Sequence, residues 1–145
     1  MRRKNLFLIV ALIISAAFAF NASLVLAKDM TAKDLVAEAK KGITVVDVAG
    51  AKAIFDKGQA TFIDCREPKE YKSGHIPGAM NIPRGLLEFK IAKKISDKNT
   101  EIVIYCKKGG RGCLAAFNLV RMGYKNVKNM DGGWKSWTKA GYPVE

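Results

Sequence analysis

Cys106 is the residue of this chain whose surroundings best suit nucleophilic chemistry. It follows an apolar run at 101–105 and begins a turn of two lysines and two glycines, which Arg111 closes before a helix-like segment. A thiol at a helix N-terminus faces unpaired backbone amides, and nearby cations also favour its ionised form. We therefore interpret Cys106 as a nucleophile or a sulfur carrier; the alternative is a buried cysteine at a strand end.

The residues after the cysteine predict an anion site. Gly109 and Gly110 permit backbone conformations in which several amides converge on one point, where they would stabilise a persulfide anion. Arg111 offers a planar fork of donors for a sulfonate-like group, and Lys107 and Lys108 add positive charge at the rim. The alternatives are a surface ion pair for the arginine and solvated charge for the lysines.

The elements that must position Cys106 alternate along the chain. Strands are predicted at 43–48, 61–64, 79–82, 101–105 and 126–130. Helical segments are predicted at 32–41, 51–57, 67–73, 86–95, 112–122 and 134–140. This alternation is typical of an α/β fold with a small parallel sheet and helices on both faces. In such sheets the reactive crevice lies beyond the carboxyl ends of the strands, where Asp64, Cys106 and Asp131 fall.

The first 27 residues have the composition of an export signal. Basic residues at 2–4 precede an uncharged run, and Val25-Leu26-Ala27 has the small or branched residues of a cleavage site. We expect a signal peptide at 1–27, a helical lead-in at 28–42 and the main domain at 43–145, located in the periplasm. Alternatively, residues 6–27 stay uncleaved and anchor the domain in the inner membrane, outside the cytoplasm.

Charge and cysteine content narrow the function classes. The net charge is +12, but no nucleic-acid motif accompanies it, so we expect a solvated surface that concentrates small anions and no nucleic-acid partner. Membrane contact is expected only if the N-terminal segment is uncleaved. The chain has three cysteines, one histidine and no C-x-x-C pair, which argues against a structural metal.

Four short motifs, in the same order, resemble those of the rhodanese-like sulfurtransferase family. They are an Asp-x-Arg-x-x-x-Glu-Tyr segment, a Gly-His-Ile-Pro-Gly-Ala-x-Asn-Ile-Pro segment, a Cys-x-x-Gly-x-Arg loop and a Gly-Gly-Trp. The matching residues are Asp64, Arg66, Glu70 and Tyr71; 74–83; Cys106, Gly109 and Arg111; and Gly132, Gly133 and Trp134. The resemblance covers about 43–145 and implies a single rhodanese-like domain.

The resemblance also implies an activity and its partners. Cys106 would take sulfane sulfur from a small anionic donor such as thiosulfate, hold it as a persulfide and pass it to cyanide or a thiol. This cycle needs neither a metal nor an organic cofactor. Asp64, Arg66 and Glu70 would have structural roles near the site, namely a carboxylate that braces the active-site loop and an Arg–Glu pair near the rim.

His75 and Trp134 complete the residues expected near the site. His75 is the only histidine, and it lies in a tight Gly-His-Ile-Pro-Gly turn. We expect its ring to be hydrogen-bonded to nearby backbone rather than to act as a general base, since an ionised Cys106 needs none. Trp134 and Trp137 are expected in the core, with Trp134 walling one side of the pocket.

Loop length and the other cysteines define the alternatives. Related phosphatases use five residues between cysteine and arginine to surround phosphate or arsenate, whereas this chain has four, which favours sulfur transfer. Cys65 stands where the family commonly has Val, and Gly112-Cys113 follows the arginine where Ser or Ala is common. Cys65 and Cys113 are either buried apolar side chains or resolving thiols. A non-enzymatic sulfur carrier or interaction module, and a thiol–disulfide redox protein pairing Cys106 with either cysteine, therefore remain open.

Overall fold

A computed structural model describes residues 29–145 of the chain. The signal peptide predicted at 1–27 and the alternative anchor at 6–27 lie outside the described residues. Within 29–145, no helix combines the length and the apolar character needed to cross a membrane.

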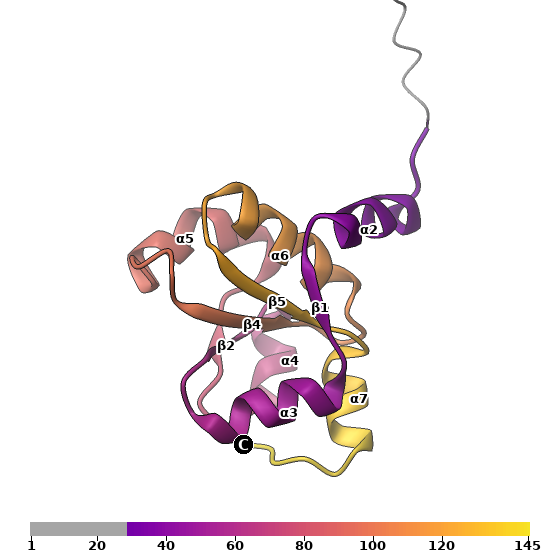
Figure 1. The fold of residues 1–145 in the computed structure, drawn as a ribbon. Helices are drawn as coiled ribbons and strands as arrows, with labels where there is room; N and C mark the ends of the chain where they lie inside the picture. The colour runs from indigo at the N-terminus through magenta and orange to yellow at the C-terminus, as the bar shows by residue number, and fades with distance from the viewer. Residues whose placement is uncertain (1–28) are drawn as a thin grey trace, which may run out of the picture.

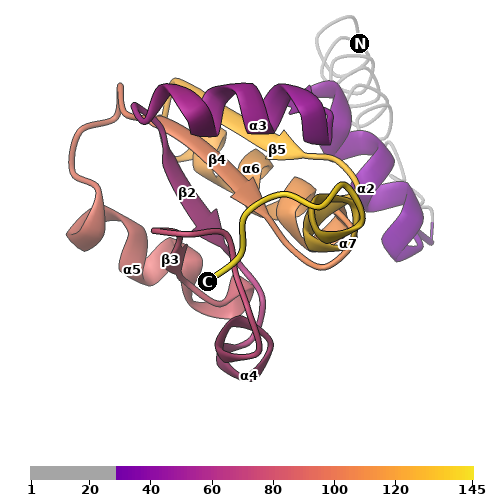
Figure 2. The ribbon, with the colours of Figure 1, turned by 90° about the horizontal axis from the view of Figure 1, so that it is seen from below.

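Five parallel strands form one sheet in the order β1-β5-β4-β2-β3 (Figures 1 and 2). The strands are β1 Thr44–Val46, β2 Thr61–Asp64, β3 Met80–Asn81, β4 Glu101–Tyr105 and β5 Asn126–Met130. The central strand β4 is buried from Ile102 to Tyr105, because helices cover the sheet on both sides. The predicted α/β class and parallel sheet are confirmed.

Helices form a layer on each face of the sheet. The helices are α2 Ala32–Lys41, α3 Val48–Lys57, α4 Pro68–Lys72, α5 Leu87–Lys94, α6 Gly110–Arg121 and α7 Gly133–Lys139, with a 3-10 turn at Arg84–Leu86. Helices α5 and α6 cover one face, and α3 and α7 cover the other (Figures 1 and 2). Helix α2 lies against α6, where the Cys113 thiol donates to the Val36 carbonyl at 3.5 Å.

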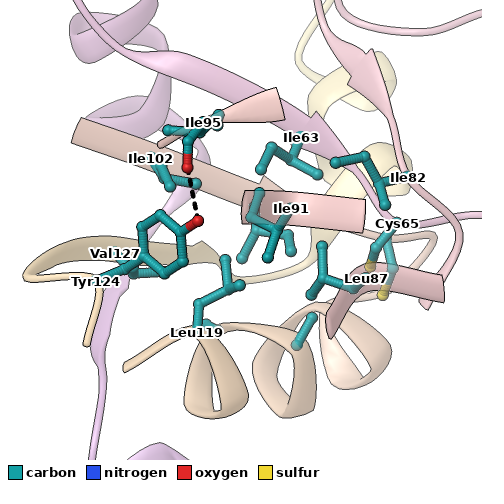
Figure 3. Packing of buried hydrophobic residues seen from close by; sticks show 14 residues of the cluster. Ile63, Cys65, Ile82, Leu87, Ile91, Ile95, Ile102, Leu119, Tyr124 and Val127 are labelled. Carbon is teal, nitrogen blue, oxygen red and sulfur yellow. Dashed lines mark hydrogen bonds between the residues drawn. The ribbon is translucent and has the colours of Figure 1, made fainter. Parts of the chain in front are cut away.

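Each face of the sheet has its own apolar core. The first cluster lies between the sheet and α5 and α6. It includes Cys106, and Cys65 lies at one end of it (Figure 3). At its other end the Tyr124 hydroxyl donates to the Ile95 carbonyl at 2.6 Å, so this buried polar group is satisfied. The second cluster lies under α3 and α7 and is centred on Trp137. Cys106 is therefore anchored between well-packed layers.

Three element boundaries differ from the sequence-based prediction by more than one residue. The strand predicted at 43–48 ends at Val46, because Asp47 caps α3 by accepting a hydrogen bond from the Gly50 amide at 2.7 Å. Helix α3 consequently begins at Val48, before the predicted start. Helix α6 begins at Gly110 instead of residue 112, immediately after the left-handed Gly109.

Candidate active site

Cys106 lies at the carboxyl end of the central strand β4, directly before helix α6. Its side chain is buried, with 2% of the residue exposed. Gly109 adopts a left-handed φ of 99°, which turns its amide back toward the cysteine, and this N–H donates to Cys106 Sγ at 3.2 Å. The backbone amides of Lys108 and Gly112 also contribute to lowering the pKa of the Cys106 thiol. The turn thus directs the Gly109 amide at Sγ, and we refer to the turn from Cys106 to Gly112 as the amide cradle.

Helix α7 holds the other side of this turn. The Trp134 amide donates to the Cys106 carbonyl at 2.8 Å, and the Lys135 amide donates to the Lys107 carbonyl at 3.0 Å. Gly133 allows this close approach, since a Cβ there would lie 2.2 Å from the Cys106 oxygen. With their carbonyls bonded to α7, the peptide groups of the turn keep their N–H groups toward the sulfur. This role of Gly133 was not deduced from the sequence, although its Gly-Gly-Trp motif was noted.

Cys65 lies beside Cys106 on the neighbouring strand end. Strands β2 and β4 pair Asp64 with Tyr105, and the Cys65 amide donates to the Tyr105 carbonyl at 2.9 Å. The two cysteines are the next residues along, both are buried in the same cluster, and each thiol shifts the pKa of the other. The sequence predicts that Cys65 is either a buried apolar side chain or a resolving thiol. It does not predict that Cys65 lowers the pKa of Cys106.

The pKa values of the two thiols move in opposite directions. The hydrogen bond from Cys65 lowers the pKa of Cys106, burial opposes this, and the surrounding amides lower it further, leaving it below the ordinary thiol value. The same hydrogen bond and burial raise the pKa of Cys65. The pair therefore consists of a thiolate at Cys106 and a protonated donor at Cys65.

Asp64 and Arg66 form a buried ion pair behind this site. Arg66 Nη2 lies 2.6 Å from Asp64 Oδ2, and the two side chains are 3% and 0% exposed. Arg66 also donates to the Gly74 carbonyl at 2.7 Å, and its guanidinium lies 4.6 Å from the centre of the Trp134 ring. The Asp64 carboxylate is thus hydrogen-bonded to Arg66. The resemblance to the family had implied a carboxylate that braces the active-site loop.

Glu70 pairs with Arg111, whereas the sequence grouped Glu70 with Arg66. Arg111 donates from Nη1 and Nη2 to the two carboxylate oxygens at 2.9 and 3.0 Å, and the hydrogen bond lowers the pKa of Glu70. An Arg–Glu pair near the rim is present, but it uses the loop arginine. Lys107 and Lys108 are exposed and form no salt bridge with any residue in 29–145.

The remaining predicted residues lie at the edges of the site. His75 stacks on Tyr71, its Nδ1 lies 3.1 Å from the Tyr71 carbonyl, and its Nε2 lies 3.7 Å from Glu145 Oε2. The ring is therefore bonded to backbone, as expected. Trp134 is half-buried against the Arg66 guanidinium and lies in the first turn of α7, beside the loop.

Asn129 is a buried polar residue near the loop that sequence reasoning did not single out. It lies on β5, and neither polar atom of its side chain has a hydrogen-bond partner within residues 29–145. Its Oδ1 would lie 2.6 Å from a Cβ at Gly112, so a side chain there would displace the Asn129 amide. Gly112 thereby lets α6 begin close to β4 and aim its amides at Cys106.

Comparisons with known proteins agree with this arrangement. The family model for the rhodanese-like domain matches residues 31–140. An HTH-type transcriptional regulator of Mycobacterium tuberculosis is 34% identical over 119 residues, which are 80% of this chain but only 50% of that protein. A thiosulfate sulfurtransferase of Escherichia coli is 33% identical over 93 residues, covering 64% of this chain and 88% of that protein.

Two solved structures resemble the whole arrangement. A protein of unknown function from Rhodopseudomonas palustris, named a possible tyrosine phosphatase, has a TM-score of 0.76 and 32% identity, covering 82% of this chain and 97% of that one. A thiosulfate sulfurtransferase from Pseudomonas aeruginosa has a TM-score of 0.70 and 25% identity, covering 79% of this chain and 22% of that one.

Proposed function

Because this chain belongs to the rhodanese-like sulfurtransferase family, we propose that it carries sulfane sulfur as a persulfide on Cys106. The observation that supports this most directly is the amide cradle, in which the Gly109 N–H lies 3.2 Å from Sγ at the start of α6. Such a cradle stabilises a thiolate before loading and an anionic persulfide afterwards. The proposed donor is thiosulfate or a similar anion, and the proposed acceptor is cyanide or a thiol.

The proposed cycle has two displacements at sulfur. The Cys106 thiolate attacks the outer sulfur of thiosulfate, the sulfur–sulfur bond breaks, and sulfite leaves with the bonding electron pair. The persulfide then loses its terminal sulfur to cyanide, which gives thiocyanate and restores the thiolate. Arg111 and the exposed Lys107 and Lys108 would attract the sulfonate end, although Glu70 offsets part of the arginine charge.

We place this reaction in the periplasm, on the basis of the export-like composition of residues 1–27. Cell fractionation of the full-length chain, with N-terminal sequencing of the product, checks both export and cleavage. Recovery in the cytoplasm would contradict this placement without affecting the proposed chemistry.

The test of the proposed function is sulfite release and thiocyanate formation by the purified protein. Wild type is expected to release one equivalent of sulfite from thiosulfate alone and to turn over when cyanide is added. Cys106→Ser should do neither, because an alcohol at this position cannot accept sulfane sulfur. Cys113→Val is the matched control, since it replaces a buried thiol that bonds Val36 rather than Cys106, and it should keep both activities.

Other outcomes separate the alternatives. A single sulfite equivalent with negligible turnover would identify a stoichiometric sulfur carrier. Turnover that survives in Cys106→Ser would refute the assignment. Hydrolysis of an aryl phosphate by wild type, lost in Cys106→Ser, would instead favour the phosphatase activity suggested by the name of the Rhodopseudomonas neighbour.

A further inference from the structure

Cys65 and Cys106 lie close enough for their sulfur atoms to react with each other. They follow paired residues on β2 and β4, and the Cys65 amide still donates to the Tyr105 carbonyl, so the two strands have not separated at this point. Neighbouring strands lie about 4.8 Å apart. Disulfide-bonded cysteines have Cα atoms roughly 4–7 Å apart. The backbone spacing therefore permits a disulfide between Cys65 and Cys106.

Cys65 lies in apolar surroundings that also contain the Cys106 sulfur. Cys65 is fully buried, and Figure 3 shows it beside Leu87 and Ile82 at one end of the apolar cluster. The two thiols lie close enough that each shifts the pKa of the other. Because the rest of this cluster is apolar, the sulfur of Cys106 is the reactive group that the Cys65 thiol can reach.

We propose that Cys65 is a resolving thiol, which attacks Sγ of the Cys106 persulfide and closes a Cys65–Cys106 disulfide while releasing hydrosulfide. This step rests on the proposed function, because it consumes the persulfide that the function supplies. It adds a second outcome for the bound sulfur, namely its release as sulfide, beside its transfer to an external acceptor.

The step balances without an external oxidant. The Cys65 sulfur bonds to Cys106 Sγ, the sulfur–sulfur bond of the persulfide breaks, and the terminal sulfur leaves as hydrosulfide with the proton of Cys65. The two cysteine sulfurs lose two electrons in total, and the sulfane sulfur gains them. A dithiol reductant, supplied from outside, then reopens the disulfide. Over a full cycle the dithiol reduces thiosulfate to sulfite and sulfide.

Loading changes which of the two sulfurs is reactive. Before loading, the lowered pKa of Cys106 makes it the anion, and the raised pKa of Cys65 keeps its thiol neutral. Once the persulfide forms, the negative charge moves to the terminal sulfur near the amides of Gly109 and α6, and Sγ becomes an electrophile. The thiol of Cys65 already lies against that atom. Resolution is therefore expected after loading and in competition with an external acceptor.

The test uses the full-length reduced protein, thiosulfate and no acceptor. Wild type should release one equivalent of sulfite, then one of sulfide, and finish two hydrogens lighter with a cross-link between the peptides of Cys65 and Cys106. Cys65→Val should release the same sulfite equivalent, although more slowly, but no sulfide, and should keep one extra sulfur. Cys113→Val should behave as wild type. A wild-type chain that keeps its extra sulfur as long as Cys65→Val does would overturn the proposal.

A second arm separates this proposal from the proposed function. If neither chain releases sulfite from thiosulfate, that donor is wrong, and inorganic polysulfide followed by desalting loads Cys106 instead. Wild type must still lose the added sulfur and form the cross-link, while Cys65→Val retains it. A wild-type chain that takes up no sulfur from polysulfide, or keeps it, contradicts the resolving role.

Discussion

At the scale of single residues, the ionisation of Cys106 depends on direct hydrogen bonds more than on nearby positive charge. Hydrogen bonding by Cys65 and by backbone amides lowers the pKa of Cys106, and hydrogen bonds to a charged group contribute about 1.5–3 kcal/mol each. Lys107 and Lys108 are solvent-exposed, where ion interactions are typically below about 1 kcal/mol. Arg111 is already paired with Glu70. The cations therefore serve the incoming anion more than the thiolate.

The pH dependence of the Cys106 thiolate follows from this balance. Its pKa is lowered, so the thiolate is expected at pH 7 and should be lost only as the pH falls through the lowered value. Cys65→Val removes the largest contribution that lowers the pKa of Cys106. It should raise that pKa by about one to two pH units, given the usual strength of a hydrogen bond to a charged group. This titration is followed by the ultraviolet absorbance of the thiolate, after the absorbance of the Cys106→Ser variant at the same pH is subtracted.

Cys113→Val is the control for that titration, because its thiol bonds the Val36 carbonyl on the α2 side of α6. It should leave the midpoint of the Cys106 titration unchanged. An unshifted midpoint in Cys65→Val would show that the amides alone determine the ionisation.

At the scale of elements, the reactive turn is held between α6 and α7. Helix α6 supplies amides to the sulfur, and α7 binds the carbonyls of Cys106 and Lys107. The fit depends on Gly133, which has a φ of 57° and leaves no space for a side chain. Docking of α7 is thus a condition for the shape of the anion cradle.

Gly133→Ala tests this dependence. The added Cβ would meet the Cys106 carbonyl at 2.2 Å, so α7 or the turn must shift, and both stability and the sulfite burst should fall. Gly141→Ala is the matched control: its φ is 70°, but nothing lies within 4 Å of the new Cβ. The control should lose only about 1–2 kcal/mol, the backbone cost of a left-handed alanine, and keep its burst. Urea unfolding and sulfite assays measure both, and equal losses would contradict the docking role.

At the scale of the whole molecule, the buried Asp64–Arg66 pair ties several distant segments together. It joins the end of β2 to the Gly74 turn and to the Trp134 ring at the start of α7. Cys65 lies between these two residues, so the pair also helps to hold the resolving thiol in place. The geometry of the site therefore depends on a charge network that is closed to solvent.

Arg66→Met should destabilise the protein by about 3–5 kcal/mol, because it leaves the fully buried Asp64 carboxylate without its partner. Lys52→Met, which breaks a surface pair with Asp56, should cost no more than about 1 kcal/mol. Urea denaturation at neutral pH measures both changes. If the two variants unfold at the same urea concentration, the buried pair does not contribute the stability proposed for it.

The sequence by itself determined the features that depend on neighbours along the chain. The strand–helix alternation follows from local patterns of apolar residues, and the Cys106 turn follows from its glycines and the helix after it. The error at the end of β1 also has a local origin. The strand pattern includes Asp47, whereas the structure uses this side chain to cap α3 through the Gly50 amide. The roles of Lys107 and Lys108 remain predictions.

Only the tertiary structure decided which distant side chains meet. The order β5-β4-β2 brings Cys65 against Cys106, and the place of α4 gives Glu70 to Arg111 instead of Arg66. Local patterns do not encode strand order, because any of the predicted strands can pair with another through the same backbone hydrogen bonds. Packing of both faces of the sheet selects one order, and that selection makes two separate cysteines a chemical pair.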